Sequence, residues 1–145
     1  MAAETFQFEI VTPAASMLSQ PAELVVVPGG AGNFGVLPGH APLLSTLRPG
    51  TIEIRNKKLE VLDQVFVEGG FAEVTPERCT ILAEEALPVR DISRDEAETR
   101  LKRAHDALMV AETLGVRLVA ERDVQAAEAM VEAVEAYEKA ALRGH

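Results

Sequence analysis

The side chains that most often carry out chemistry are few in this sequence, and they do not form a catalytic pattern. The histidines, His40, His105 and His145, are scattered, and Cys79 is the single cysteine. No histidine–cysteine pair has the spacing of metal ligands, and no serine has the glycine-rich context of a hydrolase nucleophile. Cys79 shares strand parity with Ile81, so we expect it in the core as a small apolar residue. The sequence predicts neither a catalytic site nor a metal site.

Two further patterns suggest chemistry, and neither has the required context. Glu84 and Glu85 are adjacent, and neighbouring residues of a strand face opposite ways, so they are not expected to act as paired carboxylates. The segment 29–32, Gly-Gly-Ala-Gly, resembles a phosphate-binding loop. A Walker loop needs Gly-Lys-Ser/Thr leading into a helix, whereas here no lysine follows and a strand pattern resumes. We therefore expect no bound cofactor.

Composition and charge narrow the class of protein. Of 145 residues, 48% are hydrophobic and 26% are charged, as in ordinary soluble domains. The formal net charge of −9 argues against nucleic acid as a partner and against adsorption to an anionic membrane. No apolar run reaches the roughly 18 residues of a membrane span, and no signal peptide is recognisable. With a single cysteine, which fits a reducing compartment, we expect a soluble protein that binds other proteins or small molecules.

The stretch from Val25 to Gly50 organises the first part of the chain. It holds six of the ten glycines and four of the eight prolines. Each of its three short apolar runs is followed by a proline–glycine pair, at 28–29, 38–39 and 49–50. Proline fixes φ and glycine reaches positive φ, so the pattern predicts three short strands joined by tight corners.

Alternating apolar and polar residues continue this pattern on both sides of the stretch. Phe6, Phe8 and Ile10 alternate with polar residues, as expected of a half-buried strand. Further strand patterns occur at 51–55, 59–67, 71–74 and 80–83. About ten short strands are expected in all, which is typical of a β-sandwich.

The composition changes at Pro88. All eight prolines lie at or before this residue, and twelve alanines follow it. We therefore predict a sandwich domain at 1–88 and a helical segment at 89–145. The expected fold class is α+β, an N-terminal β-sandwich followed by a C-terminal antiparallel two-helix hairpin.

Capping and periodicity define the hairpin. Residues 93–96 read Ser-Arg-Asp-Glu, a capping box that predicts a helix start, and Leu114–Val116 is the expected break between the helices. Apolar residues recur at helical spacing in two stripes of similar length, Ala97, Leu101, Ala104, Leu108 and Ala111, then Ala120, Val124, Ala127, Val131, Val134, Tyr137 and Ala141. Alanine buries little area, so the seam is expected to be weak and the arm mobile.

Several motifs of the first part resemble those of a known family. Residues 28–50 read PGGAGNFGVLPGHAPLLSTLRPG, followed by GGFAEV at 69–74 and TILAE at 80–84. These motifs resemble the epsilon subunit of F-type ATP synthases, the bacterial counterpart of the mitochondrial delta subunit. The resemblance covers most of the chain. It implies a non-catalytic central-stalk subunit that links the gamma shaft to the membrane c-ring and couples proton flow to ATP synthesis. It also implies a peripheral position at the cytoplasmic face of the bacterial inner membrane, without membrane insertion.

The resemblance places His40 at the position that faces the gamma subunit. Ala41, Pro42 and Leu43 belong to the same expected interface. From the residues alone, His40 has two interpretations, a partner contact or hydrogen bonding to local backbone. The flanking prolines favour a rigid loop whose side chains lose little entropy on binding.

The resemblance also assigns a turn that faces the c-ring. Gly32, Asn33 and Phe34 fall where relatives approach the polar loops of the ring. Many relatives have an acidic residue at the position of Asn33. We therefore expect a charge-assisted contact to the ring to be absent here.

Some bacterial relatives bind ATP between their tail helices, through Ile/Leu-Asp-x-x-Arg-Ala. The matching residues 92–97 read Ile-Ser-Arg-Asp-Glu-Ala, with Ser93 in place of the acid and Glu96 in place of the arginine. A carboxylate instead of a guanidinium reverses the sign of the interaction with phosphate, so tight ATP binding is not expected. The candidate contacts are Ile92, Arg94, Arg117 and Arg122.

Relatives can also extend the tail into the catalytic head of alpha and beta subunits and block ATP hydrolysis through basic residues. The first helix carries four such residues, Arg94, Arg100, Lys102 and Arg103. The second helix is acidic beyond Arg122 and would be repelled by an acidic groove, so weak or absent inhibition is expected. The alternative function is a nucleotide-sensing inhibitory module that acts mainly through its helical tail.

Overall fold

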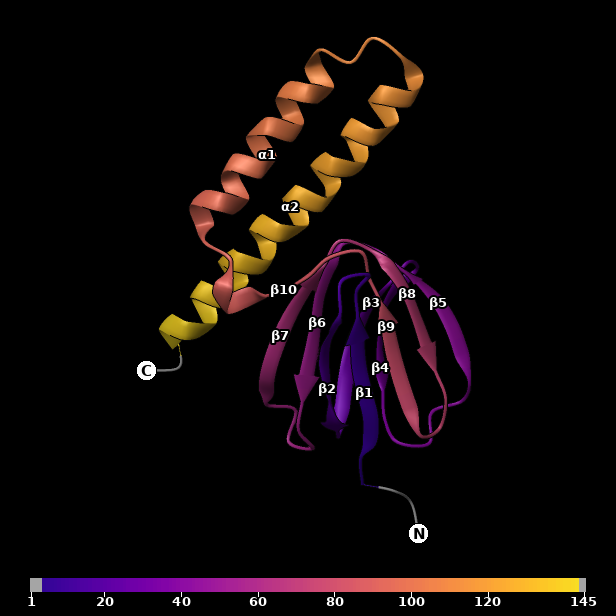
Figure 1. Cartoon of the computed structure of the whole chain (residues 1–145). Coiled ribbons are helices and arrows are strands. Elements are labelled where there is room, and N and C mark those ends of the chain that lie inside the picture. The colour runs from indigo at the N-terminus through magenta and orange to yellow at the C-terminus, as the bar shows by residue number, and fades with distance from the viewer. Residues whose placement is uncertain (1–3, 144–145) are drawn as a thin grey trace. The chain divides into compact units, whose positions relative to one another are not determined.

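The computed structural model of this chain describes residues 4–143 (Figure 1). Its strands are β1 (Phe6–Val11), β2 (Ser16–Ala22), β3 (Leu24–Gly29), β4 (Gly32–Val36), β5 (Leu43–Leu47), β6 (Gly50–Arg55), β7 (Val61–Val67), β8 (Gly70–Val74), β9 (Arg78–Leu82) and β10 (Ala86–Pro88). Its helices are the 3₁₀ helix η1 (Val89–Asp91), α1 (Arg94–Met109) and α2 (Leu114–Arg143). The chain divides into two compact units, Met1–Pro88 and Val89–His145. The predicted class, a β-sandwich followed by two helices, is confirmed.

The strands form one sheet that folds on itself. Their order is β10-β7-β6-β3-β5-β8-β9-β1-β2, and β4 pairs with β3 (Figure 1). β3 meets β5 through the pair Gly29 and Leu47, which joins one layer of the sandwich to the other. β1 and β9 run parallel, so the first strand of the chain lies beside one of the last.

Alternate residues of the strands build the core of the sandwich. In β1, Phe6, Phe8 and Ile10 are buried while Gln7 and Glu9 between them are half-buried, as the alternation predicted. The same periodicity places side chains from β3, β6, β7, β8 and β9 in one apolar cluster. Each large apolar side chain that is fully buried contributes roughly 1.5–3 kcal/mol.

Two prolines lie within strands at the edges of the sheet. Pro21 is in β2 and Pro88 is in β10, and both strands end the strand order. Proline lacks an N–H donor, so an edge strand accepts it readily. A third proline, Pro28, lies near the end of the central strand β3. The sequence pattern ended the sandwich at Pro88 without predicting a strand there. Ala86–Pro88 instead pairs antiparallel with residues 65–67 of β7.

Cys79 is a core residue, as predicted. It lies on β9 between Phe8 of β1 and Val74 of β8, and its side chain has no exposed surface. Burial raises the pKa of its thiol to about 12, because desolvation disfavours the thiolate. A thiol of this kind is not a nucleophile at neutral pH.

This pKa shift predicts a loss of stability at alkaline pH. The thiol pKa rises from 9.0 to about 12 on folding, so the unfolded chain releases the proton first. The stability contribution is therefore fully present below the unfolded value and falls with rising pH, by up to about 1.4 kcal/mol per pH unit. Urea unfolding between roughly pH 8 and 10.5 should show a steeper loss for the parent chain than for Cys79→Ala. Equal slopes for the two chains would contradict this cause.

The start of α1 is also as predicted. Ser93 is the N-cap, and its Oγ accepts a hydrogen bond from the Glu96 N–H at 3.0 Å. This bond satisfies one of the backbone donors that every helix start leaves unpaired.

The predicted break at Leu114–Val116 is wrong. α1 ends at Met109, and α2 already begins at Leu114, with Gly115 in its first turn. Thr113 sets this start, because its Oγ1 accepts from the Val116 N–H at 3.2 Å and its carbonyl accepts from the Arg117 N–H at 2.9 Å. A capping threonine therefore decides the boundary, and the glycine is tolerated inside the helix.

The buried stripe of the hairpin is only partly as predicted. The buried residues of the two predicted stripes are Ala97, Ala104, Ala120, Val124, Ala127 and Val134. Tyr137 is 38% exposed and Ala141 is exposed, contrary to prediction. The helices are not similar in length, since α2 has 30 residues and α1 has 16. The last turns of α2 therefore extend past the start of α1, and α2 contacts η1 as well as α1.

Candidate functional site

An apolar surface lies on the outward side of four neighbouring strands, β5, β8, β9 and β1. Phe71 lies opposite Thr46 on one side and Leu82 on the other, and Leu82 lies opposite Val11. Phe71 is 50% exposed, Leu82 is 46% exposed and Leu44, further along β5, is 70% exposed. We call the surface made by Val11, Leu44, Phe71 and Leu82 the outer apolar face.

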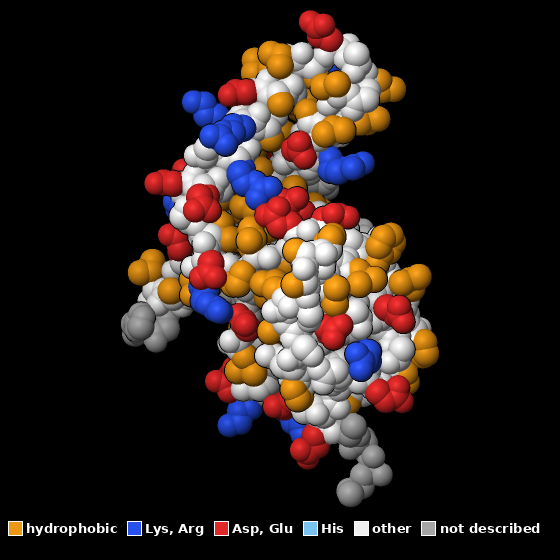
Figure 2. All heavy atoms as spheres, viewed as in Figure 1, with side chains coloured by type: hydrophobic (Ala, Val, Ile, Leu, Met, Phe, Trp, Pro, Cys, Tyr) orange, Lys and Arg blue, Asp and Glu red, His pale blue; other side chains and the backbone are white. Residues whose placement is uncertain are grey.

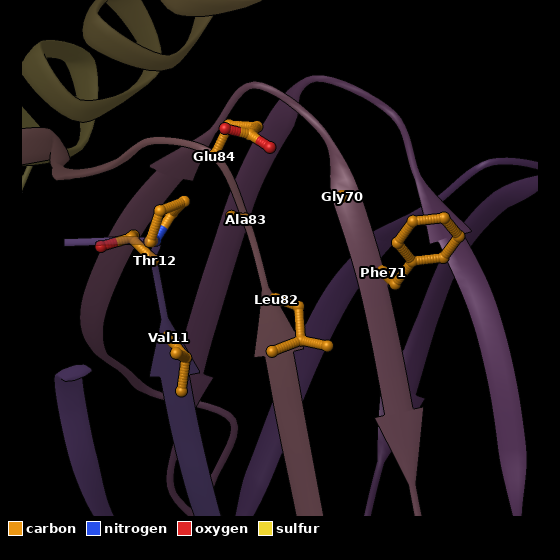
Figure 3. Close-up of a pocket in the computed structure, with 8 residues that line it drawn as sticks. Val11, Thr12, Gly70, Phe71, Leu82, Ala83 and Glu84 are labelled. Atoms are coloured by element: carbon orange, nitrogen blue, oxygen red, sulfur yellow. The ribbon is translucent and has the colours of Figure 1, made fainter. Parts of the chain in front are cut away.

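A pocket of about 430 Å³ lies at one end of the outer apolar face (Figure 3). It is lined by Val11, Thr12, Pro13, Gly70, Phe71, Leu82, Ala83 and Glu84. Figure 3 shows Val11, Leu82 and Phe71 on three adjacent strands, with Glu84 in the loop beyond them. Mostly apolar walls suit an apolar side chain of a partner better than a polar metabolite.

The loop at 37–42, which leads into β5, is held by hydrogen bonds at its centre. The Gly39 N–H donates to the Pro76 carbonyl at 2.8 Å, and the His40 N–H donates to the Leu37 carbonyl at 3.1 Å. His40 Nδ1 lies 2.7 Å from the Ala41 carbonyl oxygen. A carbonyl only accepts, so the imidazole carries a proton on Nδ1. The local backbone bond, one of the two interpretations of His40, is therefore present, and the partner contact stays a prediction.

The side chains of the other residues predicted for the gamma interface do not all face the same way. Ala41 and Pro42 are exposed in the loop. Leu43 lies opposite the buried Val74, but it is itself 39% exposed at the start of β5. Leu44, which the sequence analysis did not select, points outward instead. The exposed loop and Leu44 together extend the surface available to a partner.

The turn at 29–33 lies at the opposite end of the sandwich from His40. Gly29 pairs with Gly32 at this turn, whereas the loop of His40 is bonded to the turn between β8 and β9. Gly32 and Asn33 are exposed, and Phe34 packs against the core. The two segments predicted to contact partners are therefore not adjacent.

Arg94 lies in an acidic cluster within the hairpin. Its guanidinium Nη2 is 2.8 Å from Glu138 Oε1, and its Nη1 is 3.5 Å from Glu135 Oε1 and 3.6 Å from Glu98 Oε1. The hydrogen bond to Glu138, and then the surrounding negative charge, raise the pKa of Arg94. This arginine, a candidate both for ATP contact and for inhibition, already holds three carboxylates.

The candidate ATP contacts do not converge on one place. Ile92 is buried, and Arg122 is exposed on α2. Arg117 pairs with Glu121 at 3.3 Å near the start of α2. Arg94 of α1 instead pairs with Glu138, near the end of α2. At 1.5 Å per residue, those two places are separated by roughly 30 Å along the helix. The remaining basic candidates, Arg100, Lys102 and Arg103, are exposed on α1.

A second apolar surface surrounds the connection between α1 and α2. Met109, Val110 and Leu114 are exposed there, and Figure 2 shows apolar side chains at this end of the hairpin. A pocket of about 460 Å³ beside them is lined by Ala107, Thr113, Gly115, Val116, Val119, Ala120 and Asp123. The hairpin thus presents its apolar groups at the tip and its basic groups along α1.

The groups examined for chemistry in the sequence stay apart. Glu84 and Glu85 lie in the connection after β9, not in a strand as assumed, and His105 is exposed on α1. His145 lies outside the described residues. Within residues 4–143, no group of histidine, cysteine and acidic side chains could hold a metal ion, and no helix is long and apolar enough to cross a membrane.

Sequence reasoning missed Leu44, Phe71 and Leu82, although a signal existed for two of them. Phe71 is adjacent to the buried Ala72 in its strand, and Leu82 is adjacent to the buried Ile81, so the side chains of Phe71 and Leu82 point outward. A large apolar residue at an outward position of a half-buried strand is unusual, and two such residues on successive strands indicate a surface kept apolar.

Comparison with known proteins gives a consistent result. Residues 5–89 match the family described as the ATP synthase delta/epsilon chain beta-sandwich domain. The chain is 47% identical over 127 residues to the ATP synthase epsilon chain of Granulibacter bethesdensis, covering 86% of this chain and 93% of the relative. It is 46% identical over 131 residues to that of Rhodospirillum rubrum, covering 90% and 97%. It is 48% identical over 132 residues to that of Paramagnetospirillum magneticum, covering 91% and 98%.

Two solved structures have the same fold. A chain of the Euglena gracilis mitochondrial ATP synthase, described as OSCP/F1/c-ring in rotational state 1, superposes with a TM-score of 0.80 at 23% identity, covering 92% of this chain and 84% of that chain. A chain of the Tetrahymena thermophila mitochondrial ATP synthase, described as central stalk/c-ring, superposes with a TM-score of 0.65 at 15% identity, covering 92% and 99%. At these identities the likeness concerns the fold.

Proposed function

This chain belongs to the delta/epsilon chain family of ATP synthases, and from that premise we propose that it is a non-catalytic subunit of the central stalk. In this role the sandwich binds the gamma shaft and the membrane c-ring, so that proton-driven rotation of the ring reaches the catalytic head. The related solved chains come from assemblies described as containing a c-ring or a central stalk. We further propose a peripheral position at the cytoplasmic face of the bacterial inner membrane.

The observation that carries this proposal is the outer apolar face. It exposes Leu44, Phe71 and Leu82 on a chain whose net charge is −9. Burial of a large apolar side chain is worth about 1.5–3 kcal/mol, so three roughly half-exposed side chains contribute on the order of 3–4 kcal/mol to binding. Such a surface is costly to leave in water, and a shaft helix with apolar side chains would cover it.

A subunit that transmits torque must be stiff where it meets its partners. The strands behind the outer apolar face are backed by a fully buried core that includes Phe8, Val74 and Ile81. The His40 loop next to it is tied to the turn between β8 and β9 through the Gly39 N–H. Both features support gamma binding at this face, with His40, Ala41 and Pro42 at its margin.

The end of the sandwich opposite the His40 loop is the proposed contact with the c-ring. Gly32 and Asn33 are exposed at the 29–33 turn, and Phe34 anchors it to the core. Contacts at two ends let one rigid body connect the ring to the shaft. No bond-making step is assigned to the chain in this role.

The helical hairpin is proposed to inhibit ATP hydrolysis weakly or not at all. Arg94, the first basic residue of α1, is occupied by Glu98, Glu135 and Glu138. An extended arm would have to break these pairs and carry the acidic α2 toward an acidic groove. A contact with the alpha/beta head would then depend on the apolar tip around Met109 rather than on charge.

Truncation tests this part of the proposal. Removing the residues after Val89 should raise ATP hydrolysis by the assembled complex less than about twofold, because the arm contributes little binding energy to the head. The measurement compares complexes reconstituted with the full and the shortened chain at equal occupancy. A many-fold increase would instead assign a strong inhibitory role to the hairpin.

The proposed function as a whole is tested by association. The full chain, mixed with the purified gamma subunit, should elute with it as one species in size-exclusion chromatography. The same pair should then capture a detergent-solubilised c-ring, whereas the gamma subunit alone captures it less well. Separate elution of this chain and gamma at micromolar concentration would overturn the central-stalk assignment.

A further inference from the structure

The proposed ring-facing turn is fastened to the corner between β5 and β6 by one side chain, that of Arg48. Its Nη1 donates to the Gly29 carbonyl at 2.7 Å, and its Nη2 donates to Asn33 Oδ1 at 2.6 Å. One planar guanidinium thus bonds both the first and the last residue of the 29–33 turn. Arginine is suited to this bridging because its donors form a rigid fork.

The backbone around Arg48 reinforces the same connection. The Arg48 N–H donates to the Pro28 carbonyl at 3.0 Å, and the Gly30 N–H donates to the Thr46 carbonyl at 2.9 Å. A Cβ on Gly30 would lie 2.6 Å from Thr46 Oγ1, so the turn and β5 are in close contact. The corner that carries Arg48 therefore cannot move independently of the turn.

These contacts determine the orientation of Asn33. Its amide oxygen must face the guanidinium, since a donor can be satisfied only by an acceptor, and this fixes which end of the amide points away. Asn33 is otherwise exposed. Without Arg48, the Asn33 side chain would rotate freely and would lose conformational entropy on each contact with a partner.

We infer that Arg48 is the positioning residue of the 29–33 turn, fixing the turn and the Asn33 side chain in advance for contact with an oligomeric ring. This inference rests on the proposed function for its partner, but not for the link between Arg48 and Asn33.

A double-mutant cycle on the free full-length chain tests the link. Asn33→Asp keeps the oxygen that faces Arg48 and turns a neutral hydrogen bond into a charge-assisted one. It should raise the melting temperature of the sandwich by about 3 °C in the parent chain and by less than about 1 °C in the Arg48→Met chain. An equal effect of Asn33→Asp in both backgrounds would overturn the positioning role.

Ring binding is the readout that a merely structural role would not change. Arg48→Met should lower the affinity of the preassembled chain–gamma pair for a detergent-solubilised c-ring roughly tenfold, which corresponds to about 1.4 kcal/mol. Its affinity for gamma should stay within about twofold, because Arg48 is not part of the outer apolar face, although Thr46, which is paired with Phe71 of that face, is bonded to the turn. Arg48→Lys, which keeps the charge without the fork, should recover only part of the ring affinity. Lys58→Gln, an exposed cation in the turn between β6 and β7 at the other end of the sandwich, is the matched charge control and should change neither affinity.

The two assignments fail in different ways. If the cycle shows coupling but neither Arg48→Met nor Asn33→Ala alters ring affinity, the turn does not face the ring and the proposed function is wrong at this contact. If Asn33→Ala lowers ring affinity while Arg48→Met does not, the turn faces the ring and the positioning role of Arg48 is refuted. Loss of both affinities in both variants, with an unchanged melting temperature, would contradict the separation of the two surfaces.

Discussion

Replacing Phe71 with aspartate should weaken binding to the gamma subunit at least about a hundredfold, equivalent to roughly 2.7 kcal/mol. Phe71 belongs to the outer apolar face, is paired with Thr46 and Leu82, and lines the pocket of about 430 Å³. An aspartate there would remove an aromatic contact and place an unpaired charge in a desolvated interface. Burial of an uncompensated charge costs several kcal/mol in practice.

The same substitution should leave the sandwich folded. The Phe71 side chain points away from the core and is half-exposed, so its replacement removes little buried area on folding. The lower strand propensity of aspartate costs at most about 1 kcal/mol. Loss of gamma binding would therefore report on the interface rather than on unfolding, which circular dichroism of the variant checks.

A matched control is available on the other layer of the sandwich. Leu62 on β7 is 62% exposed, comparable to Phe71, and does not belong to the outer apolar face. Leu62→Asp should bind gamma within about twofold of the parent chain, measured by calorimetry or surface capture. Equal weakening by both substitutions would place the interface elsewhere or make it non-specific, and no weakening by Phe71→Asp would exclude the outer apolar face.

Gly70→Ala should produce the largest loss of stability of any small substitution in the sandwich, about 3–5 kcal/mol. A Cβ at Gly70 would lie 2.0 Å from the Leu82 carbonyl oxygen and 3.0 Å from Ala83 Cα, which are backbone atoms. Relief of this overlap requires β8 and β9 to separate, although Phe71 and Leu82 are paired at that point. The φ of +133° at Gly70 adds strain for any residue with a Cβ.

A comparison with Gly32→Ala separates the two causes of the stability loss, the overlap with β9 and the strain of positive φ. Gly32 has a similar φ of +141°, but a Cβ there would meet no atom within 4 Å. It should therefore cost only the conformational strain, about 1–2 kcal/mol. Urea unfolding of both variants gives the difference, which measures the overlap with β9. Similar losses for the two variants would mean that the strands adjust to the added methyl group.

Gly70 also connects stability to the proposed function. It begins β8 directly before Phe71 and lines the same pocket. The close approach of β8 to β9 sets Phe71 beside Leu82, so a residue without a side chain is needed for the apolar pair to form. The packing of the sandwich and the shape of its outer apolar face therefore have a common origin at this position.

Local patterns in the sequence determined the elements of this protein. The alternation of Phe6, Phe8 and Ile10 predicts β1, and the parity of Cys79 with Ile81 predicts its burial. The Ser93 capping box predicts the start of α1. These features depend on residues within a few positions of each other, because side chains alternate in a strand and a cap bonds within one helical turn.

Only the tertiary structure decided which surfaces exist. The outer apolar face requires β1 beside β9 and β5 beside β8, and no local pattern states that order. The bridge from Arg48 to Asn33 and the cluster of Arg94 with Glu138 likewise join residues far apart in the chain. The physical reason is that hydrogen bonds and apolar contacts between strands act through space. A residue's partner is therefore set by how the whole sheet closes, whereas its own conformation is set largely by its neighbours in sequence.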